Sequence, residues 1–262
     1  MRHEVSSRPG GQTVEKALGL LSIVVHARAP IGLAELTQAS GLDKSGVYRL
    51  MRALEARGFV GREADGRRYV PGSGLVALAA IVMDRLEIRQ IAKPFLERIS
   101  AATTETVTLH VRHQRRRVCI EVIEGMHSVR RVVPLGETTP LYTGLSGQVI
   151  LAHLPDDERS EILAEAEQAG ESRQRILDHL ALVRSRGHLA VVGERTQGVG
   201  ALSAPIFDAS GVAAALTVSG PAMRWGQAAM EAMAPLVKRE CQAMSAALGW
   251  LVPNAAARQE AR

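Results

Sequence analysis

The 262-residue sequence lacks the features of a secreted, membrane or metal-dependent protein. Its two cysteines, Cys119 and Cys241, lie far apart and form no Cys-x-x-Cys pair, so we predict neither a disulfide framework nor a structural zinc site. No apolar run approaches the roughly 20 residues that cross a bilayer, and Met1–Gly11 holds no hydrophobic stretch of a signal peptide. We therefore expect a cytoplasmic protein with no membrane partner.

Motifs that hold cofactors or perform catalysis are also missing. Neither of the glycine-rich phosphate-binding motifs, Gly-x-Gly-x-x-Gly and Gly-x-x-x-x-Gly-Lys-Ser/Thr, occurs in the sequence. Residues 144–148 would match a nucleophile elbow only with glycine in place of Gln148, and Ser146 fits a helix start better. His110 and His113 would alternate onto opposite faces of a strand, which argues against a shared metal. We expect no enzyme, no cofactor and no metal site.

What is present is an ordinary globular composition with an uneven charge distribution. Aromatic residues make up 3% and hydrophobic residues 46%, so aliphatic side chains must fill the core. Residues 1–75 carry 11 Lys and Arg against 7 Asp and Glu, whereas the remainder carries 21 against 20. A basic segment favours a polyanionic partner, although a merely solvated basic surface explains the charge alone equally well.

The first third of the chain has the pattern of a winged helix-turn-helix domain over residues 13–72. Residues 1–12 are polar and glycine-rich, and we expect a disordered tail there. Thr13 and Asp43 are suited to begin helices, and Asp65-Gly66 is a hairpin signal. The pattern predicts three helices and then two short strands, at residues 13–28, 33–39, 43–57, 59–60 and 68–70.

The third predicted helix has the properties of a DNA-recognition helix. Val47, Leu50, Met51 and Leu54 recur at helical spacing and predict one buried face. The opposite face and the following hairpin present side chains that bind bases and phosphates, and we predict DNA contacts from Lys44, Ser45, Tyr48, Arg49, Arg52, Arg67 and Arg68. The alternative is an amphipathic helix with a solvated basic face.

Residues 73–91 are expected to form a linker helix. Its apolar stripe comprises Leu75, Leu78, Ile81, Val82 and Leu86. Packing against its own first domain would bury this stripe, but we favour a dimer partner. The linker precedes the second domain, predicted over residues 92–250, and a flexible tail over 251–262.

The second domain alternates between strand and helix patterns. Strands are predicted at 106–111, 117–122, 129–133, 189–192, 200–207 and 213–218, and helices near 94–102, 145–153, 156–168, 173–186 and 227–248. Strands, then helices, then strands again indicate an α+β domain with a mainly antiparallel sheet.

Several spaced segments together make the chain resemble the isocitrate lyase regulator (IclR) family of transcription factors. Residues 41–58 are similar to its recognition segment. Its central and C-terminal signatures are similar to 131–136, 140–142, 146–148, 151–152, 186–188, 194, 198–199, 204–206 and 218–221. The resemblance implies a GAF-like effector domain, a dimerising linker helix, and a homodimer or dimer of dimers on a palindromic operator in double-stranded DNA.

The chain departs from the family pattern at a few positions. Gly46 stands where Thr is usual and weakens the helix by up to ~1 kcal/mol. Gln148 stands where Lys is common, and Val191 and Val192 stand where members that bind small oxoacids place acidic residues.

By the same resemblance, the effector pocket maps onto Leu135, Leu141, Leu145, Ser146, Val191, Val192, Ala201, Thr217 and Ser219. These residues describe an apolar slot with a few hydroxyl groups and with helix amides near Ser146 that suit a carboxylate. An aromatic acid or amide fits such a slot better than glyoxylate does. Alternating Val and Leu in strands are also what a plain hydrophobic core requires.

The sequence thus predicts a ligand-responsive, DNA-binding transcription regulator, a repressor of a catabolic operon. A metabolite-binding protein or enzyme with a vestigial DNA-binding domain is the alternative from another class. An architectural nucleoid protein is a third, and the large second domain argues against it.

Overall fold

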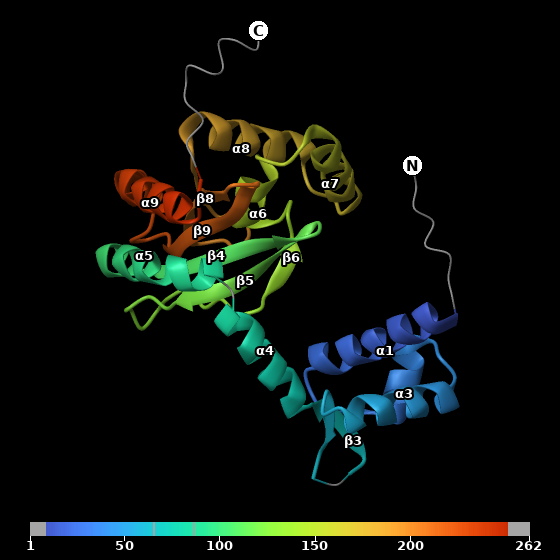
Figure 1. Ribbon diagram of the computed structural model, residues 1–262. Coiled ribbons are helices and arrows are strands. Elements are labelled where there is room, and N and C mark those ends of the chain that lie inside the picture. Colours follow the sequence, from blue (N-terminus) through green and yellow to red (C-terminus); the bar gives the residue numbers. More distant parts are fainter. Residues whose placement is uncertain (1–8, 65, 86, 251–262) are drawn as a thin grey trace. The chain divides into compact units, whose positions relative to one another are not determined.

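The computed structural model describes residues 9–64, 66–85 and 87–250, and the chain divides into two compact units at Arg85 and Leu86 (Figure 1). The predicted tails at 1–8 and 251–262 lie outside the described residues. Among the described helices, none is both long and apolar enough to span a membrane.

The first unit is a three-helix bundle with a small antiparallel sheet of order β1-β3-β2. Its elements are α1 (Pro9–His26), β1 (Ile31–Gly32), α2 (Leu33–Ser40), α3 (Lys44–Ala56), β2 (Val60–Arg62) and β3 (Arg68–Pro71). Helix α1 begins four residues before the predicted start, because Pro9 is tolerated in a first helical turn. The predicted tail is therefore wrong for residues 9–12.

The four apolar residues predicted on one face of α3 are all buried, because they close the core of this unit. They pack with residues of α1, α2, β2 and β3, namely Leu20, Val24, Leu36, Val60 and Tyr69. Helix α3 begins as predicted: the Asp43 carboxylate accepts a hydrogen bond of 2.9 Å from the Gly46 amide. A Cβ at residue 46 would lie 2.8 Å from Asp43 Oδ1, so glycine there leaves room for the cap.

The linker helix is shorter than predicted. Helix α4 (Ser73–Arg85) ends the first unit, and α5 (Glu87–Thr103) begins the second, so residues 87–91 belong to the second unit. Large apolar side chains on α4 are exposed: Val76 by 70%, Leu78 by 50%, Ile81 by 50% and Val82 by 57%.

The second unit is built on an antiparallel six-stranded sheet of order β6-β5-β4-β9-β8-β7 (Figure 1). The strands are β4 (Thr106–His113), β5 (Arg116–Ile123), β6 (Thr138–Pro140), β7 (Leu189–Val192), β8 (Val199–Asp208) and β9 (Gly211–Pro221). Helices α5 and α9 (Gln227–Ala247) pack on each other and on the sheet. The prediction of an α+β domain with a mainly antiparallel sheet is confirmed.

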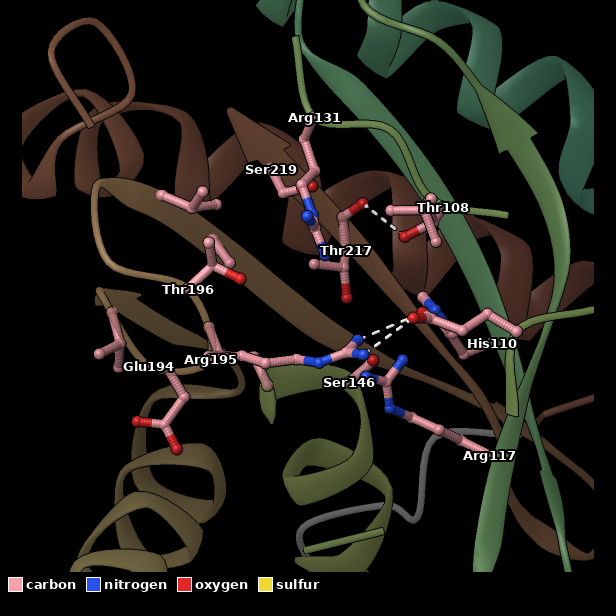
Figure 2. A pocket seen from close by; sticks show the side chains of 16 residues that line it. Thr108, His110, Arg117, Arg131, Ser146, Glu194, Arg195, Thr196, Thr217 and Ser219 are labelled. Atoms are coloured by element: carbon pink, nitrogen blue, oxygen red, sulfur yellow. Dashed lines mark hydrogen bonds and ion pairs between the residues drawn. The ribbon is translucent and has the colours of Figure 1, made fainter. Parts of the chain in front are cut away.

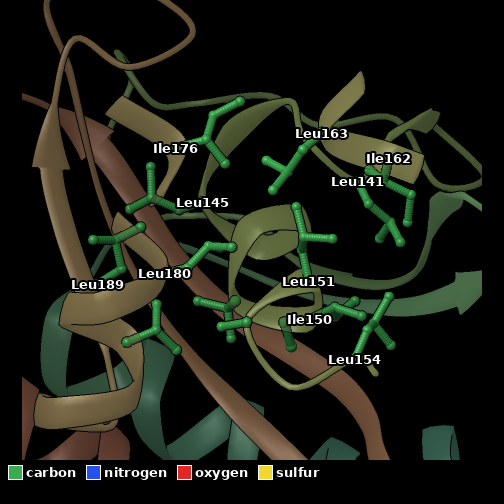
Figure 3. Packing of buried hydrophobic residues seen from close by; sticks show 14 of the residues in the cluster. Leu141, Leu145, Ile150, Leu151, Leu154, Ile162, Leu163, Ile176, Leu180 and Leu189 are labelled. Atoms are coloured by element: carbon green, nitrogen blue, oxygen red, sulfur yellow. The ribbon is translucent and has the colours of Figure 1, made fainter. Parts of the chain in front are cut away.

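A second helical layer comprises α6 (Gly144–Leu151), α7 (Asp156–Gln168) and α8 (Arg173–Arg186). Its apolar side chains form a continuous core around the fully buried α6 residues Val149, Ile150 and Leu151 (Figure 3). Because α6 is surrounded by the sheet on one side and by α8 on the other, its first turn is held rigidly beside the sheet.

One predicted strand is wrong. Residues 129–133 form an irregular loop, in which Val129 is 72% and Val132 56% exposed. The edge of β5 is paired instead with β6, through Arg117 opposite Thr139. A β-rich composition does not make a strand when the neighbouring strand edge is already occupied.

Candidate functional site

The exposed face of α3 carries all five predicted DNA-contacting side chains of that helix. Lys44, Ser45, Tyr48, Arg49 and Arg52 are each exposed, and Tyr48 keeps 49% of its surface accessible although it is aromatic. An exposed helix face that combines cations with hydroxyl donors is suited to enter a major groove.

The first turn of α3 is organised by Asp43. Ser45 Oγ donates to Asp43 Oδ2 at 2.5 Å. The hydrogen bonds from Ser45 and Gly46 lower the pKa of the Asp43 carboxyl, which therefore stays ionised. Since the Ser45 proton is used within the cap, its remaining lone pairs are left to accept from a base amino group.

Two of the three arginines on the hairpin hold the hairpin in place. Arg62 lies 3.9 Å over the Tyr69 ring and donates to its hydroxyl at 2.8 Å. Arg68, predicted to contact DNA, donates to the Pro30 carbonyl at 2.7 Å, so it fixes β3 to the segment between α1 and β1. Arg67 is exposed on the tip side of the hairpin.

The second unit contains a cavity between α6, the sheet and the loop before β6 (Figure 2). Its interior volume is about 80 Å³, within about 530 Å³ of empty space that includes the open mouth. Its lining is formed by Thr108, His110, Arg117, Arg131, Val133, Glu137, Leu145, Ser146, Val191, Glu194, Arg195, Thr196, Val199, Ala201, Thr217 and Ser219.

Six of the nine residues predicted for the effector pocket line this cavity. The other three lie elsewhere for different reasons. Leu141 is fully buried in the core around α6, whereas Leu135 and Val192 are 54% and 41% exposed and do not line the cavity. Val192 alternates with Val191 along β7, so only one of the two can face the cavity.

The sequence-based description of the pocket missed its charged residues. Arg117, Arg131, Arg195, Glu137, Glu194 and His110 all line the cavity, so its walls are far from purely apolar. His110 has a weak signal, because it lies between Leu109 and Val111 in a strand, whereas Arg117 follows Arg116 at the start of β5 and has none. Their convergence comes from the β4–β5 pairing, which no local pattern reports.

Both glutamates of the cavity are already paired. Arg195 donates to Glu137 at 2.9 and 3.3 Å (Figure 2). Burial raises the pKa of Glu137, but the hydrogen bond and charge of Arg195, with the charges of Arg117 and Arg131, outweigh it, so the pKa is lowered and the pair is charged. Glu194 is bound by Arg175 at 2.6 Å and by Gln148 Nε2 at 3.0 Å.

Gln148 is the centre of a buried polar network behind the cavity. Its Nε2 also donates to the Tyr142 carbonyl at 3.0 Å, and its Oε1 lies 2.8 Å from His179 Nδ1. A Lys, common here in the family, would pair directly with Glu194. In this chain Arg175 supplies that cation, and a neutral Gln148 completes the hydrogen bonds.

Arg117 and His110 are buried in the cavity without partners that match them. Arg117 is 4% exposed, its Nε has no hydrogen-bond partner, and its Nη2 reaches only the Thr143 carbonyl at 3.5 Å. Burial lowers the pKa of Arg117 to about 10, which leaves it charged at neutral pH. Both His110 ring nitrogens lack partners, and burial, with the charges of Arg117 and Arg195, lowers the pKa of His110 well below its ordinary value.

Fold and recognition helix together define a winged helix-turn-helix transcription regulator, and comparison with known proteins agrees. The IclR helix-turn-helix domain matches residues 13–64, and the domain described as bacterial transcriptional regulator IclR C-terminal matches residues 80–246. The chain belongs to the IclR family of bacterial transcriptional regulators and is a DNA-binding regulator.

Individual relatives share the whole architecture. The regulator KipR of Bacillus subtilis is 29% identical over 91% of this chain and 98% of its own length. KdgR of Escherichia coli is 27% identical over 91% and 93%. The crystal structure of Thermotoga maritima IclR is 30% identical, covers 91% of this chain and 99% of that one, and gives a TM-score of 0.68. These relatives are regulators, which disfavours an enzyme with a vestigial DNA-binding domain.

Proposed function

We propose that this chain is a ligand-responsive repressor of a catabolic operon, and that a small organic acid bound in the cavity controls its hold on DNA. The observation that carries the proposal is the buried, charged guanidinium of Arg117 at the cavity wall, which forms no direct ion pair and whose Nε has no hydrogen-bond partner. A buried charge that is incompletely hydrogen-bonded is costly, so a site that retains one is suited to an anionic ligand.

The effector class follows from the rest of the lining. Leu145, Val191 and Ala201 supply an apolar wall, and Ser146 in the first turn of α6 lies near helix amides that favour negative charge. An aromatic acid, or an amide of one, matches both halves of the cavity. A structurally similar IclR homolog from Microbacterium hydrocarbonoxydans, 20% identical with a TM-score of 0.74, was crystallised with 4-hydroxybenzoate.

On the DNA side, we propose that two copies read a palindromic operator in double-stranded DNA. The exposed apolar residues of α4, namely Val76, Leu78, Ile81 and Val82, would be buried in a homodimer, on its own or within a dimer of dimers. Two recognition helices would then present Lys44, Tyr48 and Arg49 to successive major grooves.

The effector acts by binding one arrangement of the dimer better than another. A ligand can shift such an equilibrium only by the difference between its affinities for the two states. In our proposal the effector-bound state holds the two DNA-reading units at a spacing that fits the operator less well, so the operon is derepressed.

Fluorescence anisotropy on the DNA upstream of the protein's own gene tests this function. Wild-type protein should bind that DNA tightly and lose affinity steeply with added salt, and an aromatic acid should weaken binding. Arg49→Ala should weaken binding about 10- to 100-fold. Arg239→Ala removes an exposed arginine from α9 and is the charge-matched control.

Two results would overturn the proposal. If the protein binds this DNA no more tightly than random DNA, it does not recognise an operator there. If it binds tightly but no organic acid alters the affinity, the proposed control by an effector is wrong.

A further inference from the structure

The charges in the cavity do not balance, and the imbalance identifies the ligand more closely than its walls do. Three arginines and two glutamates line the cavity. Glu137 is neutralised by Arg195, and Glu194 by Arg175, which is not a lining residue. Two guanidinium groups, those of Arg117 and Arg131, remain without a carboxylate partner among the described residues.

The two unpaired arginines belong to opposite ends of the sheet face. The Arg131 carbonyl accepts a hydrogen bond of 2.6 Å from Thr106, which pairs with Ser219 at the beginning of β4. Arg117 on β5 lies opposite Arg112 in the strand register. Arg112 is six residues beyond Thr106 along β4, which corresponds to about 20 Å of strand. In Figure 2, Arg131 accordingly lies on the side of Ser219 and Arg117 on the side of Ser146.

The Glu137 carboxylate acts on Arg117 and Arg131 at longer range, but its hydrogen bonds go to Arg195. The polar groups between Arg117 and Arg131 are otherwise uncharged. Thr217 and Thr108 lie there, and their hydroxyl protons are used: Thr217 donates to Ser203 at 2.9 Å and Thr108 to the Thr217 carbonyl at 3.3 Å. His110 lies nearer the Arg117 end, where its unpartnered ring is 3% exposed and offers one N–H donor.

We propose that the effector is a dianion, a small molecule with a carboxylate or equivalent group at each end. One group binds Arg117 and His110, and the other binds Arg131, while the middle of the molecule lies against Leu145, Val191 and Ala201. This inference rests on the proposed function, since it names the ligand class of the same cavity. The two anionic ends would each compensate one arginine, Arg117 or Arg131. A monoacid would compensate only one of them, and a neutral amide neither.

Isothermal titration calorimetry with the full-length protein tests the inference. The probes are benzene-1,4-dicarboxylate, its half-amide 4-carbamoylbenzoate, and benzoate, with succinate and adipate as shorter and more flexible diacids. The best diacid should bind at least about tenfold more tightly than the half-amide or the monoacid, because each charged hydrogen-bonded end adds affinity.

Matched variants locate the two ends. Arg131→Gln should reduce the preference for the diacid over the half-amide to nearly one, and Arg117→Gln should weaken the binding of every acid about tenfold or more. Arg115→Gln, which removes an exposed arginine paired with Glu161 and Glu165 two residues from Arg117, should leave all affinities unchanged.

A folding defect is separable from a binding defect. Because Arg117 forms no direct ion pair and only one long hydrogen bond, and feels Glu137 only at longer range, Arg117→Gln should lower the thermal midpoint of the ligand-free protein little. If it lowers the midpoint strongly, the Arg131→Gln variant provides the test instead, because Arg131 is partly exposed and its replacement should not affect folding.

The inference is overturned if no diacid binds, if benzoate or the half-amide binds as tightly as the diacid, or if Arg131→Gln keeps the diacid preference. A monoacid or amide that binds and also alters operator affinity would preserve the proposed function while refuting the dianion. Operator binding that no ligand alters would instead refute the proposed function itself.

Discussion

The two units of this protein use charged residues in opposite ways. In the first unit, Lys44, Arg49 and Arg52 lie on an exposed helix face, where water solvates them. In the second, Arg117 and His110 are buried at the wall of a cavity, where Arg117 forms one long hydrogen bond and the His110 ring forms none. Solvent therefore compensates the charges of the first unit, whereas in our proposal a ligand compensates those of the cavity.

The sharpest test of this comparison separates the stability of the two units. Met51 is fully buried in the core of the first unit. Met51→Ala should lower that unit's free energy of unfolding by about 2–5 kcal/mol and abolish DNA binding. Both tryptophans, Trp225 and Trp250, belong to the second unit, so their fluorescence should show an unchanged urea transition while circular dichroism shows an early one.

Met223→Ala is the matched control, because this methionine is fully exposed. It should change neither transition. A parallel loss of both signals in Met51→Ala would mean that the two units unfold as one, and the comparison would fail.

Disrupting the polar network behind the cavity should have the next largest effect on stability. Gln148 is fully buried and joins Glu194, His179 and the Tyr142 carbonyl. Gln148→Met removes its hydrogen bonds to His179 and the Tyr142 carbonyl, while Glu194 keeps Arg175, and it should destabilise the second unit by about 1–3 kcal/mol, measured by tryptophan fluorescence in urea. Gln174→Met, on the exposed surface of α8, should have little effect. Equal stability of the Gln148 variant and wild type would show that the network is dispensable.

How far the sequence predicts each unit follows from the same contrast. The buried face of α3 depends only on a period of 3.6 residues. The spacing of Val47 and Met51 therefore predicts the core side, and that of Lys44 and Arg49 predicts the exposed side. The cavity depends on which strands become neighbours. Six lining residues could be placed by resemblance to the family, but the pairing of β4 with β5 that brings Arg117 beside His110 has no local signature.

The errors have physical causes as well. The segment 129–133 has the composition of a strand, but β5 already pairs with β6, so these residues form the loop that brings Arg131 to the cavity. The DNA contact predicted for Arg68 stays a prediction, because the side chain is about half exposed, but the sequence did not indicate its structural partner. Its hydrogen bond to the Pro30 carbonyl joins residues 38 positions apart, which no spacing rule reports.

The pH dependence of stability should distinguish the two histidines of β4. Burial, Arg117 and Arg195 lower the pKa of His110 well below its ordinary value in the folded protein. In the unfolded chain it takes up a proton as pH falls through about 6.5, whereas the folded chain does not. The folded state therefore loses stability from about pH 7 downward, by at most ~1.4 kcal/mol per pH unit for this group.

Urea unfolding at pH 7.5, 6.5 and 5.5, followed by tryptophan fluorescence, measures the effect. His110→Gln should flatten the decline, while His113→Gln, exposed on the opposite face of the same strand, should leave it as in wild type. The same decline in all three proteins would show that His110 does not titrate as its burial requires.

The smallest expected effect concerns the cap of the recognition helix. Asp43→Ala removes the hydrogen bonds to the Gly46 amide and the Ser45 hydroxyl, and it should lower the thermal midpoint of the first unit by a few degrees. Asp43→Asn keeps an oxygen acceptor, so it should retain most of that midpoint. Because it also removes a negative charge beside the phosphates, it should bind DNA slightly more tightly than wild type. Equal loss of stability in the two variants would mean that the carboxylate charge, rather than the hydrogen-bonded cap, stabilises the start of α3.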